Sequence, residues 1–281
     1  MNHGKTIEMF LVDGTADGIV TAELSNWNGK AIKLPRTEVA ACERQDIAGV
    51  GVYFLFGSDK QGETVYIGES ENVLKRLKQH LNDKPDEYWS CAVAFTSPAL
   101  DKALIRYLED RLVALAHAAG RYRVTTQNTY GTHVSESQKA TMEEFIDNMR
   151  VLLSAMNFRV LEPVPAAKSD TVILRCRSKA VKDEGRRADA KGFVSPNATG
   201  FTVLAGSRVA AQAVPSFATQ CRNYAELREQ LIANGTIQDG VFARDYEFSA
   251  PSAASAVVLG RSSNGNVDWR TEDGVKLGAL E

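Results

Sequence analysis

The chain has 281 residues, of which 44% are hydrophobic and 24% are charged, and its formal net charge is −2. This length and composition are typical of a globular protein with one large or two ordinary domains and argue against disorder of the whole chain. The weak negative charge excludes a uniformly basic surface, so a nucleic-acid ligand would have to be held by local clusters of Lys and Arg.

The four cysteines, at positions 42, 91, 176 and 221, include no C-x-x-C pair. We therefore expect small reduced core residues rather than a structural zinc site or a disulfide framework. The N-terminus has no apolar core of signal-peptide length, and no run approaches the roughly 18 apolar residues of a membrane span. We expect no membrane contact and a cytoplasmic location.

Short extended segments dominate the first part of the chain. The alternation of apolar residues and the turn signals Asp13-Gly14 and Asn28-Gly29 predict strands at 6–12, 18–24 and 31–34. Pro35 is followed by a predicted helix at 37–44. Residues 1–48 are therefore interpreted as an N-terminal β-rich extension.

Strand and helix patterns alternate in residues 49–162. Strands are predicted at 51–56, 64–68 and 91–95, and helices at 70–81, from Ser97-Pro98 to Ala119, and at 138–156. Ser70 is the expected N-cap of the first helix, and Gly120 is expected to end the second.

A Pro- and Ala-rich linker at 163–170 precedes a second small α+β domain at 171–281, with a strand predicted at 172–176 and a helix at 223–233. Residues 175–191 contain seven basic and three acidic residues, Arg186 and Arg187 among the basic ones. This excess fits either a solvated loop or a patch that contacts phosphate.

Two tyrosines belong to the tripeptide motifs Gly51-Val52-Tyr53 and Tyr66-Ile67-Gly68, which lie on two consecutive predicted strands. A symmetric hairpin would place Tyr53 and Tyr66 across from each other on one face. Such a pair either stabilises the sheet or belongs to a site. Glycine inside a strand often marks a place where another backbone or a ligand comes close.

Arg76 and His80 lie one turn apart on the predicted helix 70–81, so they share a face, and Lys75 and Lys78 lie near them. They form either a solvated basic face or a phosphate-binding face, since an arginine fork suits phosphate oxygens and neutralises charge that develops on phosphorus oxygens. The two lysines are candidate DNA contacts, as are Arg186 and Arg187.

Glu109 lies at the edge of the apolar stripe of the helix that ends at Ala119. It is either an exposed acid paired with Arg106 or a magnesium ligand, because magnesium commonly takes one or two protein carboxylates together with substrate phosphate. Asn128 lies in a polar segment after this helix and either braces the site or is an ordinary loop residue.

With these residues in this order, residues 51–128 resemble the GIY-YIG nuclease family. The resemblance rests on six matched residues, which are Tyr53, Tyr66, Arg76, His80, Glu109 and Asn128. It implies an α/β (α+β) domain with a small mixed three-stranded sheet flanked by helices, and cleavage of DNA with one divalent ion, Mg²⁺ or Mn²⁺. Residues 171–281 resemble an uncharacterised C-terminal domain attached to such nucleases and to restriction-modification proteins. The likeness lies in the run 245–254, in Val258-Leu259-Gly260, in Asn264-Gly265 and in Trp269. It suggests a role in guiding substrate choice.

By this resemblance Tyr53 is the general base or positions the attacking water, Tyr66 supports the nucleophile or contacts phosphate, Arg76 stabilises the transition state, and Glu109 holds the metal. A phenol has a pKa of about 10, so Tyr53 needs nearby positive charge to act near neutral pH. Glu69, directly after the second tripeptide motif, departs from this pattern because an acid there repels phosphate unless it faces away.

The sequence therefore predicts a metal-dependent DNA endonuclease. The alternatives are a non-catalytic DNA-binding or regulatory protein on a nuclease scaffold, and a protein-interaction scaffold that binds no nucleic acid. Cutting both strands with one such site requires a homodimer or two successive nicks, and restriction-modification or repair proteins are the expected partners.

Overall fold

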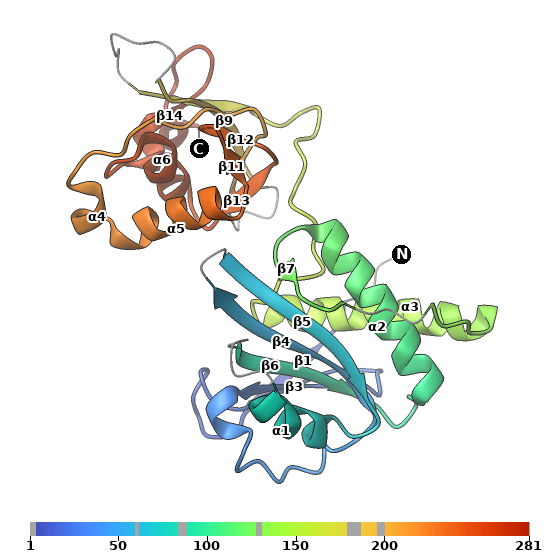
Figure 1. Cartoon of the computed structure of the whole chain (residues 1–281). Coiled ribbons are helices and arrows are strands. Elements are labelled where there is room, and N and C mark those ends of the chain that lie inside the picture. Colours follow the sequence, from blue (N-terminus) through green and yellow to red (C-terminus); the bar gives the residue numbers. More distant parts are fainter. Residues whose placement is uncertain are drawn as a thin grey trace. The chain divides into compact units, whose positions relative to one another are not determined.

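The computed structural model describes residues 4–59, 62–83, 89–127, 131–178, 187–195 and 200–280. The chain forms two compact units, one that ends at Pro163 and one formed mainly by the chain from Val164 onward (Figure 1). Each unit has its own sheet and its own hydrophobic core.

The first unit contains seven strands and three α-helices within the described residues. Its strands are β1 (Ile7–Leu11), β2 (Val20–Leu24), β3 (Lys30–Pro35), β4 (Gly51–Asp59), β5 (Gly62–Ser70), β6 (Trp89–Thr96) and β7 (Arg123–Val124). Its helices are α1 (Val73–Asp83), α2 (Lys102–Ala119) and α3 (Glu136–Ala155).

All seven strands form one mixed sheet in the order β1-β2-β3-β6-β4-β5-β7, with β7 parallel to β5. The predicted α+β class is confirmed. The expected three strands are present as the neighbours β6, β4 and β5, but the sheet is larger. Strand β3 pairs with β6 along its length, from Lys30 opposite Thr96 to Pro35 opposite Cys91. The N-terminal strands therefore extend the same sheet.

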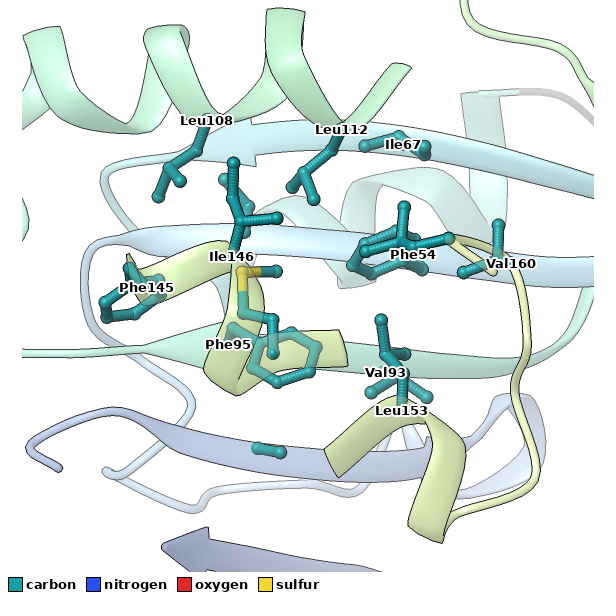
Figure 2. Close-up of a cluster of buried hydrophobic side chains, with 14 of the residues drawn as sticks. Phe54, Ile67, Val93, Phe95, Leu108, Leu112, Phe145, Ile146, Leu153 and Val160 are labelled. Atoms are coloured by element: carbon teal, nitrogen blue, oxygen red, sulfur yellow. The ribbon is translucent and has the colours of Figure 1, made fainter. Parts of the chain in front are cut away.

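One face of this sheet is covered by α2 and α3. The apolar stripe of α2, which includes Leu108 and Leu112, packs over the strands, and Figure 2 shows these side chains gathered with Phe54 and Phe95 of the sheet. Burial of this stripe is the main source of stability for the helix, because apolar area removed from water stabilises by roughly 25 cal/mol per Å².

The opposite face is covered by α1, whose Val73, Leu74 and Leu77 pack against Leu34 and Leu55. Residues that alternate along a strand point to opposite faces, so Tyr53 lies on the α1 face while its neighbours Val52 and Phe54 lie on the other. The strand β4 thereby places the Tyr53 phenol next to α1.

Two helices begin later than expected because local side chains cap them. The Asn72 side chain accepts a hydrogen bond from the backbone N–H of Lys75 at 2.9 Å, whereas Ser70 accepts one from the N–H of Asn72 itself. In α2 the Asp101 side chain accepts from Ala103 and Leu104, both at 2.9 Å. The helix ends as expected at Gly120.

The helix predicted at 37–44 is wrong: this segment contains a short 3-10 turn at Arg36–Glu38 followed by turns. The third long helix, α3, begins at a capping box in which Ser135 and Gln138 exchange side-chain and backbone hydrogen bonds.

The second unit has a five-stranded antiparallel sheet in the order β13-β10-β9-β8-β14. Its strands are β8 (Leu174–Arg177), β9 (Asp189–Val194), β10 (Phe201–Val203), β13 (Tyr246–Phe248) and β14 (Trp269–Arg270), and β11 (Ile237–Gln238) and β12 (Val241–Phe242) form a separate pair. Its helices are α4 (Phe217–Gln220), α5 (Arg222–Ala233), α6 (Pro251–Leu259) and α7 (Gly265–Asp268).

Helix α6 is buried on nearly all sides and forms the centre of the second core. The buried guanidinium of Arg228 on α5 donates to the carbonyl oxygens of Val257 and Ala210, and the indole N–H of Trp269 donates to the carbonyl of Pro251 at 3.0 Å. These bonds tie α5 and β14 to the two ends of α6.

All four cysteines are free thiols. Within the part of the chain that the structure describes, no helix has both the length and the apolar character needed to cross a membrane.

We expect Gly51→Ala to lower the free energy of unfolding by about 1–3 kcal/mol, the usual effect of overpacking. A Cβ at Gly51 would press against the carbonyl of Phe95, where β4 and β6 pair closely. Gly49→Ala is the matched control, because the nearest atom to its Cβ would be 4.0 Å away. Urea denaturation measures both, and equal stability of the two variants would contradict this packing argument.

Candidate active site

The centre of the candidate site is a hydrogen bond between the hydroxyl of Tyr53 and Nε2 of His80, 2.8 Å long and buried. Tyr53 is 1% exposed and His80 6% exposed. Since Tyr53 comes from β4 and His80 from α1, the bond joins the sheet to the helix that covers it. The site histidine is thus a core residue and not part of a solvated helix face.

Tyr66 packs beside this pair on the same face of the sheet. Its ring centroid lies 6.2 Å from that of Tyr53, with an interplanar angle of 30°, and 5.2 Å from that of His80. The prediction that both phenols share one face is confirmed. Tyr66 is half-buried, so it forms the outer side of the cluster.

Gly68 makes room for the Tyr53 phenol. A Cβ at Gly68 would lie 2.5 Å from the Tyr53 hydroxyl and 2.8 Å from a ring carbon of Tyr66. Both distances are shorter than van der Waals contact, so no residue with a side chain fits there without moving a tyrosine. The groups that come close to this glycine are tyrosine side chains, and not the backbone or ligand that a strand glycine was expected to mark.

The half-buried guanidinium of Arg76 lies close to both phenols. Burial acts to lower its pKa, but charge interactions and hydrogen bonds with Tyr53 and Tyr66 outweigh burial and raise it. Arg76 also donates to Oε1 of Gln79 at 3.2 Å. Because Arg76 and Tyr66 are the less buried members of the cluster, they are the ones that an incoming ligand meets.

The Tyr53 hydroxyl is held in its neutral form. Burial, followed by the nearby Tyr66, raises the pKa of Tyr53 well above its usual range, and the Arg76 charge only partly opposes this. The negative charge of Glu109 adds to the increase.

Glu109 is buried, at 5% exposure, so the alternative of an exposed helix acid is wrong. The backbone N–H of Glu69 bonds to its carboxylate, while Oε2 has no hydrogen-bond partner among the described residues. Burial, together with the charges of Glu69 and Asp110, raises the pKa of Glu109 to about 7. A buried carboxylate oxygen without a partner is costly, and a cation beside it would remove that cost.

Glu69, which departs from the nuclease pattern, also lies at the candidate site. Its side chain is 16% exposed, and its Oε1 lies 3.6 Å from Nε of Arg106. Its charge contributes to the raised pKa of Glu109. The sequence feature that points to Glu69 is its position directly after Gly68, on a strand that ends at the site.

The edge of β5 is closed by the chain that follows β7. The Thr126 hydroxyl accepts from the N–H of Ile67 and donates to its carbonyl, both at 2.8 Å. These two hydrogen bonds hold the backbone of Ile67, the residue before Gly68, in place. Asn128, a predicted site residue, lies outside the described residues.

The predicted DNA contacts are distributed over both units. Lys75 is exposed and Lys78 half-buried on α1, next to Arg76 in the sequence. Arg187 belongs to the second unit, where its Nε donates to the carbonyl of Ser178 at 3.2 Å. Arg186 lies outside the described residues.

The site fits a hard divalent ion better than zinc. In the described ranges no group of three or more His, Cys, Asp or Glu side chains is arranged to hold a metal. Zinc sites generally need three or four such ligands, whereas magnesium keeps several waters and takes one or two carboxylates. Glu109, with Glu69 beside it, matches the second pattern.

The comparisons with known proteins concern mainly the second unit. Residues 181–281 match the model of a domain of unknown function, DUF4357. The C-terminal segment is therefore a recognised domain of the kind expected from its sequence. No curated protein and no solved structure matches the chain.

We expect Glu109 to make the metal-free protein less stable as pH rises. The folded protein keeps a proton up to about pH 7 that the unfolded chain releases near pH 4.5, so stability falls through this window, by on the order of 3 kcal/mol at most. Glu109→Gln is neutral at every pH and lacks this decrease.

The measurement is the free energy of unfolding of both proteins in chelator at about pH 5 and about pH 8. Relative to the wild type, the free energy of unfolding of the Glu109→Gln variant is expected to be higher at about pH 8 than at about pH 5. Parallel pH profiles would show that Glu109 ionises normally.

Proposed function

We propose that the protein is a metal-dependent DNA endonuclease of the GIY-YIG kind that hydrolyses phosphodiester bonds. The observation that carries this proposal is the convergence of Tyr53, Tyr66, His80 and Arg76 around one buried hydrogen bond, with Glu109 close enough to act electrostatically on Tyr53. These side chains come from two strands and two helices. The matching order of these residues in the sequence is an independent reason for the same proposal.

Arg76 and Tyr66 are proposed to receive the scissile phosphate. They are the half-exposed members of the cluster, and an arginine fork binds phosphate oxygens in a bidentate manner. The permanent charge of Arg76 is available to stabilise the additional negative charge of the pentacoordinate transition state. The nearby tyrosines keep the guanidinium in place.

Tyr53 and His80 are proposed to take up the proton of the attacking water. Because the Tyr53 phenol is neutral, it accepts the proton of the water while it passes its own proton to Nε2 of His80, which requires the His80 tautomer with its proton on Nδ1. The water oxygen forms the new bond to phosphorus, and the bond from phosphorus to the leaving sugar oxygen breaks. The leaving oxygen takes a proton from solvent.

Glu109 is proposed to hold the ion, with Glu69 as a neighbouring carboxylate. Mg²⁺ or Mn²⁺ bound there supplies positive charge that offsets the two carboxylates and polarises phosphate oxygens. The raised pKa of Glu109 and its Oε2, which has no hydrogen-bond partner in the part of the chain that the structure describes, support this assignment. The second unit is proposed to guide substrate choice, and cleavage of both strands would need two copies of the chain or two successive nicks.

We expect the purified chain to nick or cut DNA with magnesium and to stop when chelator is added. Arg76→Ala is expected to reduce the rate at least about a hundredfold, because it removes a donor aimed at transition-state charge. Lys139→Ala, which removes an exposed charge on α3, is the matched control and is expected to leave the rate unchanged. Wild-type rates in the Arg76 variant would rule out this mechanism.

We expect Tyr53→Phe to abolish cleavage while leaving the affinity for DNA in chelator unchanged. The variant keeps the ring that packs against Tyr66 and removes only the hydroxyl that bonds His80. A gel-based rate assay and a binding assay on the same preparation separate the two effects. Cleavage that persists in this variant would exclude Tyr53 from the proton transfer.

A second candidate function is DNA binding without cleavage. The strong burial of Tyr53 and its raised pKa favour this alternative, since both disfavour loss of a proton from the phenol. It predicts binding without turnover in magnesium or manganese.

A further inference from the structure

A line of four cations crosses the outer face of the sheet in the second unit. In the strand register Arg175 lies opposite Arg270 on one side and opposite Lys191 on the other, and Arg270 lies opposite Lys276. Residues that oppose each other across neighbouring strands point to the same face. We call Lys276, Arg270, Arg175 and Lys191 the cationic row.

The cationic row lies on the face turned away from the core. Leu174 and Cys176, which flank Arg175 along β8, are buried in the second core with Trp269. In contrast, Lys191, Arg270 and Lys276 are exposed. The bond from Trp269 to the carbonyl of Pro251 fixes β14, and hence the position of Arg270, against α6.

The row is electrostatically unfavourable by itself. Like charges directly opposite each other destabilise a sheet. Arg175 is compensated by two bonds to Asp189, of 2.6 and 2.5 Å, but the side chains of Lys191 and Lys276 make no hydrogen bond or ion pair among the described residues. A sheet that keeps such a row carries a repulsion that an anionic partner would relieve.

A second row strengthens the positive field. Asp189 lies between Arg177 and Arg208, each directly opposite it in the register. The Asp189 carboxylate is thus shared between Arg175 and Arg177, with Nε of Arg177 3.4 Å from its oxygen, whereas Arg208 is joined to Asp189 through the backbone. The only acidic side chain of these two rows is already engaged.

Two hollows of about 290 and 410 Å³ lie on this face, and Arg175 lines both. Their lining contains six cationic side chains, in Arg175, Arg177, Lys191, Arg208, Arg261 and Arg270, and three carboxylates, in Asp189, Asp268 and Glu272. The excess of positive charge contrasts with the net charge of −2 of the whole chain. The lining includes no aromatic side chain, so bases have no surface on which to stack.

We propose that the cationic row of the second unit binds the phosphate backbone of duplex DNA. The β-strands lie about 4.8 Å apart, so the four cations are spread over roughly 14 Å. Along the axis of B-DNA each nucleotide chain carries one charge per about 3.4 Å, so this length corresponds to about four phosphates of one chain. Contacts of this kind position a protein on DNA without reading its sequence. The inference specifies the substrate-guiding part of the proposed function and does not depend on hydrolysis.

The test uses the full chain and a short fluorescent DNA duplex in chelator, where no cleavage occurs, with anisotropy measured over a salt series. The double variant K191Q/R270Q removes two exposed charges of the row. It is expected to weaken binding and to lower the slope of log affinity against log salt by about 2. The control K168Q/R222Q removes two exposed charges elsewhere in the same unit and is expected to keep the wild-type slope.

Thermal unfolding separates loss of binding from loss of folding. Because the double variant relieves repulsion in the row, its Tm is expected to equal or exceed that of the wild type. A slope that stays at the wild-type value, or falls equally in the control, would overturn the proposal. Equal affinity of the wild type for polyglutamate and for the duplex would overturn the assignment to DNA.

The binding result and the cleavage result are independent. Loss of binding in K191Q/R270Q supports the DNA surface even if no magnesium-dependent cleavage is found. Conversely, cleavage that depends on Arg76 together with unchanged binding in K191Q/R270Q overturns the surface and leaves the nuclease proposal standing.

Discussion

The hydrogen bond between Tyr53 and His80 is the constraint on which the candidate site depends. It is buried, it joins β4 to α1, and it fixes the two side chains whose protons the proposed chemistry moves. An unpartnered polar group at either position would be costly. Gly68 serves the same arrangement, because only a residue without a side chain leaves space for the phenol. Gly68 on β5 and His80 on α1 therefore both fit the position of the Tyr53 phenol.

The groups around this bond differ in both charge and burial. The buried phenol is neutral, the half-buried guanidinium of Arg76 is positive, and the buried carboxylate of Glu109 has a pKa raised to about 7. Groups with strongly shifted pKa values gathered in one place are more frequent at functional sites than elsewhere. Ion-pair networks of purely structural origin also shift pKa values, but here the carboxylate oxygen lacks a partner among the described residues.

Much of this arrangement was predictable from residue spacing. The leucines of α2 recur at helical intervals, and Leu104, Leu108 and Leu112 are buried. Arg76 and His80, four residues apart, share a helix face. The seven-stranded sheet was not predictable, because the pairing of β3 with β6 joins segments sixty residues apart. The start of α2 was placed too early because Asp101, rather than the Ser97-Pro98 pair, caps it.

The burial of Glu109 and the role of Glu69 were also beyond the sequence. A helix position at the edge of an apolar stripe becomes buried or exposed according to what packs over it, and here β5 brings Glu69 to that edge. The cationic row likewise depends on strand register, since Lys276, Arg270, Arg175 and Lys191 come from separate segments. The local charge excess at 175–191 indicated only one part of it.

The proposed chemistry requires the two tyrosines, Arg76, His80 and Glu109 to form one phosphate-hydrolysing site. Its most direct measurement is a crystal structure of the chain with manganese and a short DNA duplex, in which anomalous scattering locates the ion. We expect an ion about 2.1 Å from a Glu109 oxygen and a phosphate in contact with the Arg76 guanidinium. An ion bound elsewhere, or DNA that leaves this cluster uncontacted, would contradict it.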